Sequence, residues 1–135
     1  MSTNKIKILI VEDYSRIAEA WSNILTNEGY DIIGISSGEK EGLEIAEELN
    51  PDIVLMDINL KEGNGISCTQ NLMSSLPNCK VIALSMYNDK KHFEDMFNAG
   101  AVGYVTKNSS IKEILNAIEV VLEGGIYICD EMKDI

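Results

Sequence analysis

Five polar residues that could do chemistry lie at the ends of apolar runs of the chain. Glu12 and Asp13 follow one run, and Asp57 follows a second in the stretch DIVLMD. Ser85 ends a third run, and Lys107 closely follows a fourth. Carboxylates gathered at one place raise one another's pKa unless a positive charge lies between them, and an oxygen-seeking divalent cation can supply that charge. What these residues can do therefore depends on whether the fold brings them together.

Apolar β-type runs and helical patterns alternate along the chain. The β-type runs are 6–11, 30–35, 53–56, 81–84 and 101–105, and the helical patterns are 17–25, 39–49, 65–76, 89–98 and 111–122. Such alternation, with nearly continuous apolar strands, indicates a parallel sheet covered by helices on both faces. We therefore expect an α/β fold with a doubly wound, five-stranded parallel sheet, strand order 2-1-3-4-5, in the flavodoxin-like (βα)5 arrangement.

The last helix has readable ends. Ser110 and Glu113 are spaced as a capping box, and Gly124 with Gly125 predicts its C-terminal stop. With 135 residues, of which 45% are apolar, the chain is long enough for one core and too short for two comfortable ones. We expect a single domain over residues 1–135, with its core at about 5–125.

The predicted strand order places the polar residues at one edge of the sheet. Ligands of such folds bind outside the carboxyl ends of the strands, where the strand order reverses. Strands one and three are neighbours there, so Asp13 and Asp57 should face each other. Two carboxylates and a backbone carbonyl suit Mg²⁺, which keeps several waters and attracts a phosphate oxygen. Lys107 would add a positive charge and Ser85 a hydroxyl. Any one of these residues alone is better explained as a cap, a turn or a surface charge.

Composition excludes several classes of function. The chain has 22 acidic and 11 basic residues, and its net charge of -11 opposes direct binding to nucleic acid or to an anionic membrane. Three cysteines and one histidine have no zinc-site spacing and form no disulfide framework. No apolar run approaches the roughly 18 residues of a membrane span. We expect a protein of the reducing cytoplasm.

The same positions carry a family resemblance over essentially the whole chain. The matching stretches are the pair Glu12-Asp13, Asp57 at the end of VLMD with Gly65 closing its loop, Ser85 ending ALS, and GAVGYVTK with Lys107 as its last residue. In these motifs the chain resembles the receiver domain of two-component response regulators. The stretch from Phe97 to Ile128 is similar to receivers joined to LuxR-type helix-turn-helix output domains.

The resemblance implies a role for each site residue. Asp57 would be the phosphoacceptor. Asp13, Asp57 and the main-chain carbonyl of Asn59 would ligate Mg²⁺, and Glu12 would support the ion through water. Lys107 would pair with the phosphoryl group.

Two residues would form the switch. Ser85 would report the arrival of the phosphoryl group by moving toward it, and Tyr104 on the fifth strand would swing into the space that Ser85 leaves. Without the phosphoryl group, we expect the Tyr104 ring to point outward or to occupy mixed rotamers.

The implied function is that of a signalling switch and not of a turnover enzyme. A sensor histidine kinase would donate the phosphoryl group, and the output would be transcription, through a C-terminal helix-turn-helix domain, a downstream protein or a phosphorylation-dependent homodimer. Two alternatives share the fold. A small Mg²⁺-dependent phosphatase with an aspartyl-phosphate commonly has a second acid where this chain has Asn59, and a flavodoxin-like cofactor module would need a phosphate loop where Glu12 and Asp13 repel phosphate.

The chain departs from the family pattern in two places. A proline and a glycine commonly follow the phosphoacceptor, whereas Lys61 and Glu62 stand here, so we expect a less constrained loop. A proline, often in a cis bond, usually follows the active-site lysine, whereas Asn108 stands here. A cis bond before a residue other than proline costs about 2.5 to 4 kcal/mol. The sequence leaves the conformation of the Lys107-Asn108 peptide open.

Overall fold

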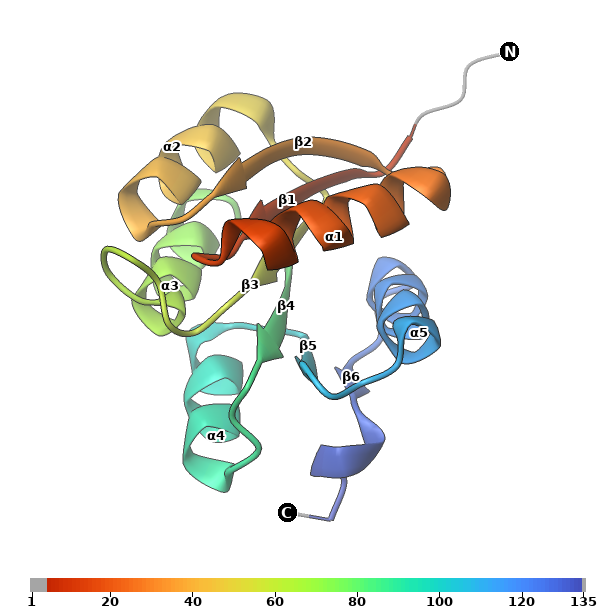
Figure 1. Ribbon diagram of the computed structural model, residues 1–135. Coiled ribbons are helices and arrows are strands. Elements are labelled where there is room, and N and C mark those ends of the chain that lie inside the picture. The colour runs from red at the N-terminus through yellow and green to blue at the C-terminus, as the bar shows by residue number, and fades with distance from the viewer. Residues whose placement is uncertain (1–4, 135) are drawn as a thin grey trace.

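The sheet of the computed structural model, which describes residues 5–134, is parallel and has six strands in the order β2-β1-β3-β4-β5-β6 (Figure 1). The strands are β1 Lys7–Val11, β2 Asp31–Ser36, β3 Ile53–Met56, β4 Lys80–Ser85, β5 Gly103–Thr106 and β6 Tyr127–Ile128. Strands β1, β3, β4 and β5 are almost wholly buried, as expected of a sheet covered on both faces.

Five α-helices cover the sheet, with α1 and α5 on one face and α2, α3 and α4 on the other (Figure 1). They are α1 Ser15–Asn27, α2 Glu39–Leu49, α3 Gly65–Ser75, α4 Lys90–Ala99 and α5 Ile111–Leu122. The alternation of strands and helices and the doubly wound α/β architecture are therefore as predicted. Among the described residues, no helix is long and apolar enough to cross a membrane.

The prediction of a five-stranded sheet is wrong at one edge. The sixth strand, β6, pairs in parallel with β5, with Tyr127 opposite Gly103 and Ile128 opposite Tyr104. Two residues are too few to show the alternation from which strands are recognised, and they follow a Gly-Gly stop that indicates the end of regular structure. The added strand extends the predicted order 2-1-3-4-5 to 2-1-3-4-5-6.

The hydrophobic core continues past residue 125, where the sequence places its end. Cys129 is fully buried and Met132 is almost so, and both belong to the same cluster as the central strands. Cys129 immediately precedes the short 3₁₀-helix η1, Asp130–Met132, which follows β6, and Met132 is the last residue of this helix. The tail of the chain is therefore part of the packed domain.

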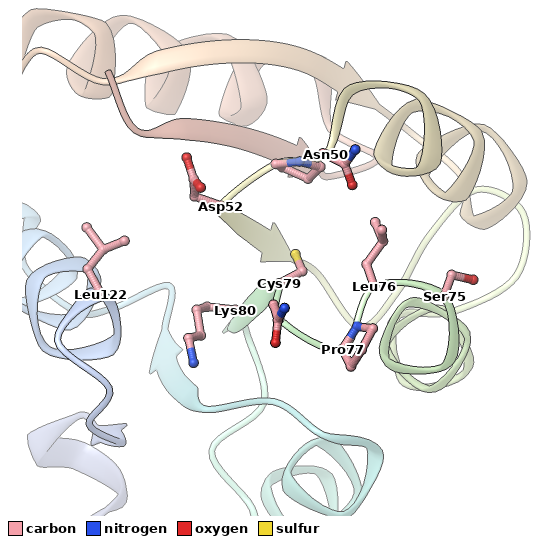
Figure 2. A pocket seen from close by; sticks show the side chains of 10 residues that line it. Asn50, Asp52, Ser75, Leu76, Pro77, Cys79, Lys80 and Leu122 are labelled. Atoms are coloured by element: carbon pink, nitrogen blue, oxygen red, sulfur yellow. The ribbon is translucent and has the colours of Figure 1, made fainter. Parts of the chain in front are cut away.

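A cavity of about 380 Å³ lies at the amino-terminal ends of strands β3 and β4, opposite the strand ends that carry the predicted site (Figure 2). Asp52 and Lys80, beside the starts of β3 and β4, border it together with Pro77 and Leu122. The Asp52 carboxylate accepts a hydrogen bond of 2.8 Å from the main-chain N–H of Lys7 and thus serves the sheet. This cavity has none of the predicted site residues in its lining.

Half of the predicted capping box is present at the N-terminus of α5. The Ser110 hydroxyl accepts a hydrogen bond of 3.1 Å from the main-chain N–H of Glu113. The Glu113 carboxylate points elsewhere, because it accepts hydrogen bonds from the Tyr127 hydroxyl at 3.0 Å and the Asp130 N–H at 2.8 Å. Glu113 therefore fastens the tail to α5.

Removal of the Ser110 hydroxyl should destabilise the domain. The variant Ser110→Ala leaves the Glu113 N–H without its acceptor, and we expect a loss of about 1 kcal/mol in the free energy of unfolding, measured by urea denaturation. The control is Ser74→Ala on α3, since that exposed serine bonds only a carbonyl of its own helix. Equal stabilities of the two variants would show that the cap contributes nothing.

Candidate functional site

The register of the sheet brings the three predicted acids together. Val11 of β1 lies opposite Met56 of β3, and the Asp57 N–H donates to the Val11 carbonyl at 2.9 Å, so the two strands end level with each other. Glu12, Asp13 and Asp57 each offer a carboxylate oxygen within 4.8 Å of the others. The predicted juxtaposition of Asp13 and Asp57 is therefore present, with Glu12 as a third member.

Lys107 supplies the positive charge of this cluster. Its Nζ lies 2.8 Å from Glu12 Oε1 and 3.1 Å from Asp57 Oδ2. The end of β5 positions it, because the Lys107 N–H donates to the Ser85 carbonyl at 2.7 Å and so extends the ladder between β4 and β5. The Lys107-Asn108 peptide is trans, like every other peptide bond in residues 5–134.

Burial dominates the electrostatics of Glu12, whose side chain is 4% exposed. Removal from water raises the pKa of its carboxyl to about 7, although the Lys107 ammonium and the Tyr14 N–H both favour the charged form. Burial alone would lower the pKa of Lys107, yet the carboxylates of Glu12 and Asp57 outweigh it and raise that pKa. The cluster thus holds more negative charge than one lysine balances.

This donor set fits a magnesium ion. The carboxylate oxygens are hard ligands, they come from strand ends that the sheet holds in place, and their excess negative charge calls for a second cation besides Lys107. Both Glu12 oxygens have partners in the protein, Lys107 and the Tyr14 N–H. Asp13 and Asp57 are therefore the better candidates for direct ligation.

Ser85 lies at the end of β4 beside this cluster, with its side chain fully buried. Its hydroxyl accepts a hydrogen bond of 2.9 Å from the main-chain N–H of Tyr87. Because that N–H belongs to the loop between β4 and α4, a movement of Ser85 would leave the loop without one of its anchors.

The expected outward position of Tyr104 is wrong for this structure. The ring is fully buried, lies edge-on to Phe93 at 5.4 Å between centroids, and directs its hydroxyl to the Tyr87 carbonyl at 2.8 Å. Burial raises the pKa of Tyr104 to about 12, so the hydroxyl stays a donor. The hydrogen bond to the Tyr87 carbonyl holds the ring in its inward position, and sequence patterns do not reveal this contact.

Tyr87 is a contact residue that the sequence analysis missed. Its hydroxyl accepts a hydrogen bond of 2.7 Å from the Asn59 side chain, and its ring stacks on His92 at 3.7 Å. It therefore joins the loop after Asp57 to the loop after Ser85. Its place two residues beyond Ser85, at the same edge of the sheet, was the available signal.

The loop after Asp57 is tied down, contrary to the expectation of a less constrained segment. The Glu62 carboxylate accepts a hydrogen bond of 3.0 Å from the Lys40 N–H, and its carbonyl accepts one of 2.9 Å from the Glu39 N–H. The N-cap of α2, Gly38, has no side chain to cap that helix. Glu62 performs this role from the loop, so one charge-assisted hydrogen bond and one main-chain hydrogen bond compensate for the missing proline and glycine.

Gly65 is explained by a close approach of two backbone segments. A Cβ atom at this position would collide with the main-chain carbonyl of Asp57. The Gly65 N–H donates to the Ile58 carbonyl at 2.8 Å, which closes the loop. Any side chain here would push the backbone of Asp57 out of register with Glu12.

The raised pKa of Glu12 predicts a pH dependence of stability in the metal-free protein. Between about 4.5, the ordinary pKa of this group, and about 7, the folded protein binds a proton that the unfolded chain has released. The free energy of unfolding should therefore fall as the pH rises through this window. We expect Glu12 to account for about 1 to 3 kcal/mol of that fall.

The test compares urea unfolding of the parent and of Glu12→Gln at pH 5 and pH 7 in the presence of a chelator. The glutamine keeps an acceptor for Lys107 but does not titrate, so the dependence should flatten. Glu48→Gln, at an exposed position on α2, is the control and should behave as the parent does. An unchanged pH dependence in Glu12→Gln would contradict the assignment.

Comparisons with known proteins agree with this geometry. The family model of the response regulator receiver domain matches residues 8–119. The transcriptional regulatory protein DegU of Brevibacillus brevis is 33% identical over 95% of this chain and 55% of its own length. LnrK of Bacillus subtilis, also a transcriptional regulatory protein, is 36% identical over 94% of this chain and 58% of its own length. The chain thus spans little more than half the length of these curated relatives.

Solved structures share the fold. A LuxR-family two-component response regulator from Aurantimonas sp. SI85-9A1 superposes with a TM-score of 0.92 and 26% identity, covering 97% of this chain and 94% of its own. A chain of the CheX-CheY-BeF₃-Mg complex from Borrelia burgdorferi superposes with a TM-score of 0.82 and 27% identity, covering 87% of this chain and 89% of its own. Because the family model covers most of the chain and the relatives DegU and LnrK are more than 30% identical over nearly all of it, the chain belongs to the response regulator receiver domain family.

Proposed function

We propose that this domain accepts a phosphoryl group on Asp57 and passes the change to an output that controls transcription. The observation that carries the proposal is the position of Asp57, which lies in the buried cluster of acids with Lys107 at 3.1 Å from its Oδ2. A carboxylate at this place is a nucleophile with a fixed positive neighbour. The donor would be a phosphohistidine on a sensor histidine kinase.

The transfer balances without further reactants. An oxygen of the Asp57 carboxylate attacks the phosphorus, an O–P bond forms, and the N–P bond breaks with its electron pair leaving on the imidazole nitrogen. Lys107 then has a phosphoryl oxygen to neutralise in addition to its carboxylate partners. Water reverses the state later by hydrolysing the aspartyl-phosphate. This is self-modification of a switch and not turnover of a free substrate.

Mg²⁺ is the cofactor of the proposal. Asp13, Asp57 and the main-chain carbonyl of Asn59 would hold it, with Glu12 acting through water because both of its oxygens already have protein partners. When bound, the ion supplies positive charge that neutralises the transferred group. The alternative of a phosphatase is disfavoured by Asn59, whose side chain occupies the place of a second acid and donates to Tyr87.

Ser85 and Tyr104 are the proposed switch residues. A phosphoryl group on Asp57 brings acceptor oxygens to the end of β4, and Ser85 can rotate to donate to one of them. The Tyr87 N–H would then lose its acceptor, while the Tyr104 hydroxyl would keep its hydrogen bond to the Tyr87 carbonyl. The rearranged loop between β4 and α4 is the changed surface that a partner reads.

The wider context also belongs to the proposal. The relatives named above are transcriptional regulators of greater length, and we infer that this receiver acts in the cytoplasm through an output domain, a downstream protein or a homodimer formed on phosphorylation. The net charge of -11 supports an indirect route to DNA, since the domain itself repels the phosphate backbone.

Asp57→Asn should abolish phosphorylation. The amide is a poor nucleophile, so incubation with a small phosphodonor and Mg²⁺ should add one phosphate to the parent and none to the variant, as measured by intact mass. Asp31→Asn, at an exposed position on β2, is the control and should be labelled normally. Excess chelator should suppress labelling of the parent. Undiminished labelling of Asp57→Asn would overturn the assignment.

Tyr104→Phe tests the switch while keeping the buried ring. Phosphate uptake should stay within about twofold of the parent because Tyr104 does not touch Asp57. The loop amides at Tyr87 and Asn88 should exchange hydrogen faster even before phosphorylation, because the Tyr87 carbonyl has lost its donor. Tyr30→Phe is the control. Loop exchange that responds to phosphorylation as in the parent would remove the Tyr104 hydroxyl from the mechanism.

A further inference from the structure

The segment Tyr127–Met132 pairs with β5 and continues toward the carboxyl ends of the strands, where the candidate site lies. We name it the C-terminal clasp. Its strand half continues the sheet, because the Tyr127 N–H donates to the Val102 carbonyl and the Cys129 N–H to the Tyr104 carbonyl, each at 3.0 Å. Its helical half ends in the buried side chain of Met132. Figure 1 shows the segment running beside β5.

Glu131 makes the contacts that set this segment apart from a simple sixth strand. Its Oε1 accepts a hydrogen bond of 2.5 Å from the Thr106 hydroxyl, and its Oε2 accepts one of 2.9 Å from the Asn88 side chain. These two donors lower the pKa of the Glu131 carboxyl. One carboxylate therefore joins two segments that are 18 residues apart in sequence, positions 88 and 106.

Both partners of Glu131 are adjacent to the site. Thr106 is buried, precedes Lys107, and lies opposite Ser85 in the ladder between β4 and β5. Asn88 follows Tyr87, whose N–H is held by the Ser85 hydroxyl. A displacement of Ser85 would therefore disturb the hydrogen bond from Asn88 to Glu131 through the loop, whereas the hydrogen bond from Thr106 on β5 to Glu131 would stay.

We propose that Glu131 is a positioning residue that holds the loop between β4 and α4 in its present arrangement, and that movement of this loop on phosphorylation of Asp57 releases the C-terminal clasp. The inference rests on the proposed function, because it needs Ser85 to move toward the phosphoryl group. It adds a direct route from the phosphorylation site to the tail of the domain, which passes through Asn88.

Linkage makes the route reciprocal. If phosphorylation weakens the clasp, then the clasp opposes phosphorylation to the same extent. A variant without the Glu131 carboxylate should therefore have an equilibrium constant for phosphoryl transfer to Asp57 about fivefold greater than that of the parent. A merely structural role for Glu131 would lower stability without this gain.

Cys129 provides a direct measure of release. Its side chain is fully buried in the folded domain, so alkylation by iodoacetamide requires the clasp to open. Cys68, a fully buried residue of α3, serves as the internal reference for unfolding of the whole domain. The rate at each cysteine is followed by peptide mass, and phosphorylation of the same sample by intact mass.

Phosphorylation of the parent should accelerate Cys129 alkylation about fivefold and leave Cys68 unchanged. Glu131→Ala should show the faster rate without phosphodonor and little further response. Glu131→Gln keeps a carbonyl acceptor and should restore part of the parent's behaviour. Glu123→Ala removes the same charge from an exposed position after α5 and should match the parent.

The outcomes separate the two proposals. A parent that takes up no phosphate overturns the proposed function and the coupling with it. A parent that takes up phosphate while Cys129 alkylation stays constant overturns only the coupling. A Glu131→Ala variant with the parent's Cys129 rate shows that the carboxylate does not hold the clasp.

Discussion

The repulsion among Glu12, Asp13 and Asp57 is the constraint on which the rest of the molecule depends. Three carboxylates held within 4.8 Å repel one another, and the burial of Glu12 adds to the cost of its charge, so the surroundings must fix these side chains in place and supply positive charge. The register of β1 with β3 fixes them, and the ladder between β4 and β5 delivers Lys107 at the same level. The parallel sheet thus serves as the rigid frame of an electrostatically unfavourable cluster.

The positions of these charged residues were predictable because a parallel sheet turns sequence into geometry in a simple way. Each buried strand is a visible apolar run, and its carboxyl end must lie at the common edge. Glu12, Asp57 and Lys107 could therefore be placed together with no knowledge of the loops. Strand β6 could not be foreseen, because its two residues gain their structure only from pairing with β5.

Loop contacts were beyond the reach of sequence patterns for the same physical reason. Glu62 caps α2 and Tyr87 anchors Tyr104 through contacts between residues far apart in the chain, which no local periodicity encodes. One departure from the family pattern shows this well. The residues Lys61-Glu62 suggested a loose loop, whereas the Glu62 carboxylate, by reaching Lys40, fastens it. Similarly, Glu113 fits a capping box in sequence, but the tail competes successfully for its carboxylate.

Strand β6 also has a consequence for how the molecule behaves in a crowded solution. Without it, β5 would be an edge strand and would present unpaired main-chain groups to which another chain could add. The Val102 and Tyr104 carbonyls instead accept hydrogen bonds from the N–H groups of Tyr127 and Cys129, and β6 itself is only two residues long and is followed closely by η1. So short a strand is a poor template for a foreign one. The C-terminal clasp therefore prevents the addition of another strand to the sheet. A domain that released the clasp would expose the main-chain groups of β5 for as long as the release lasted.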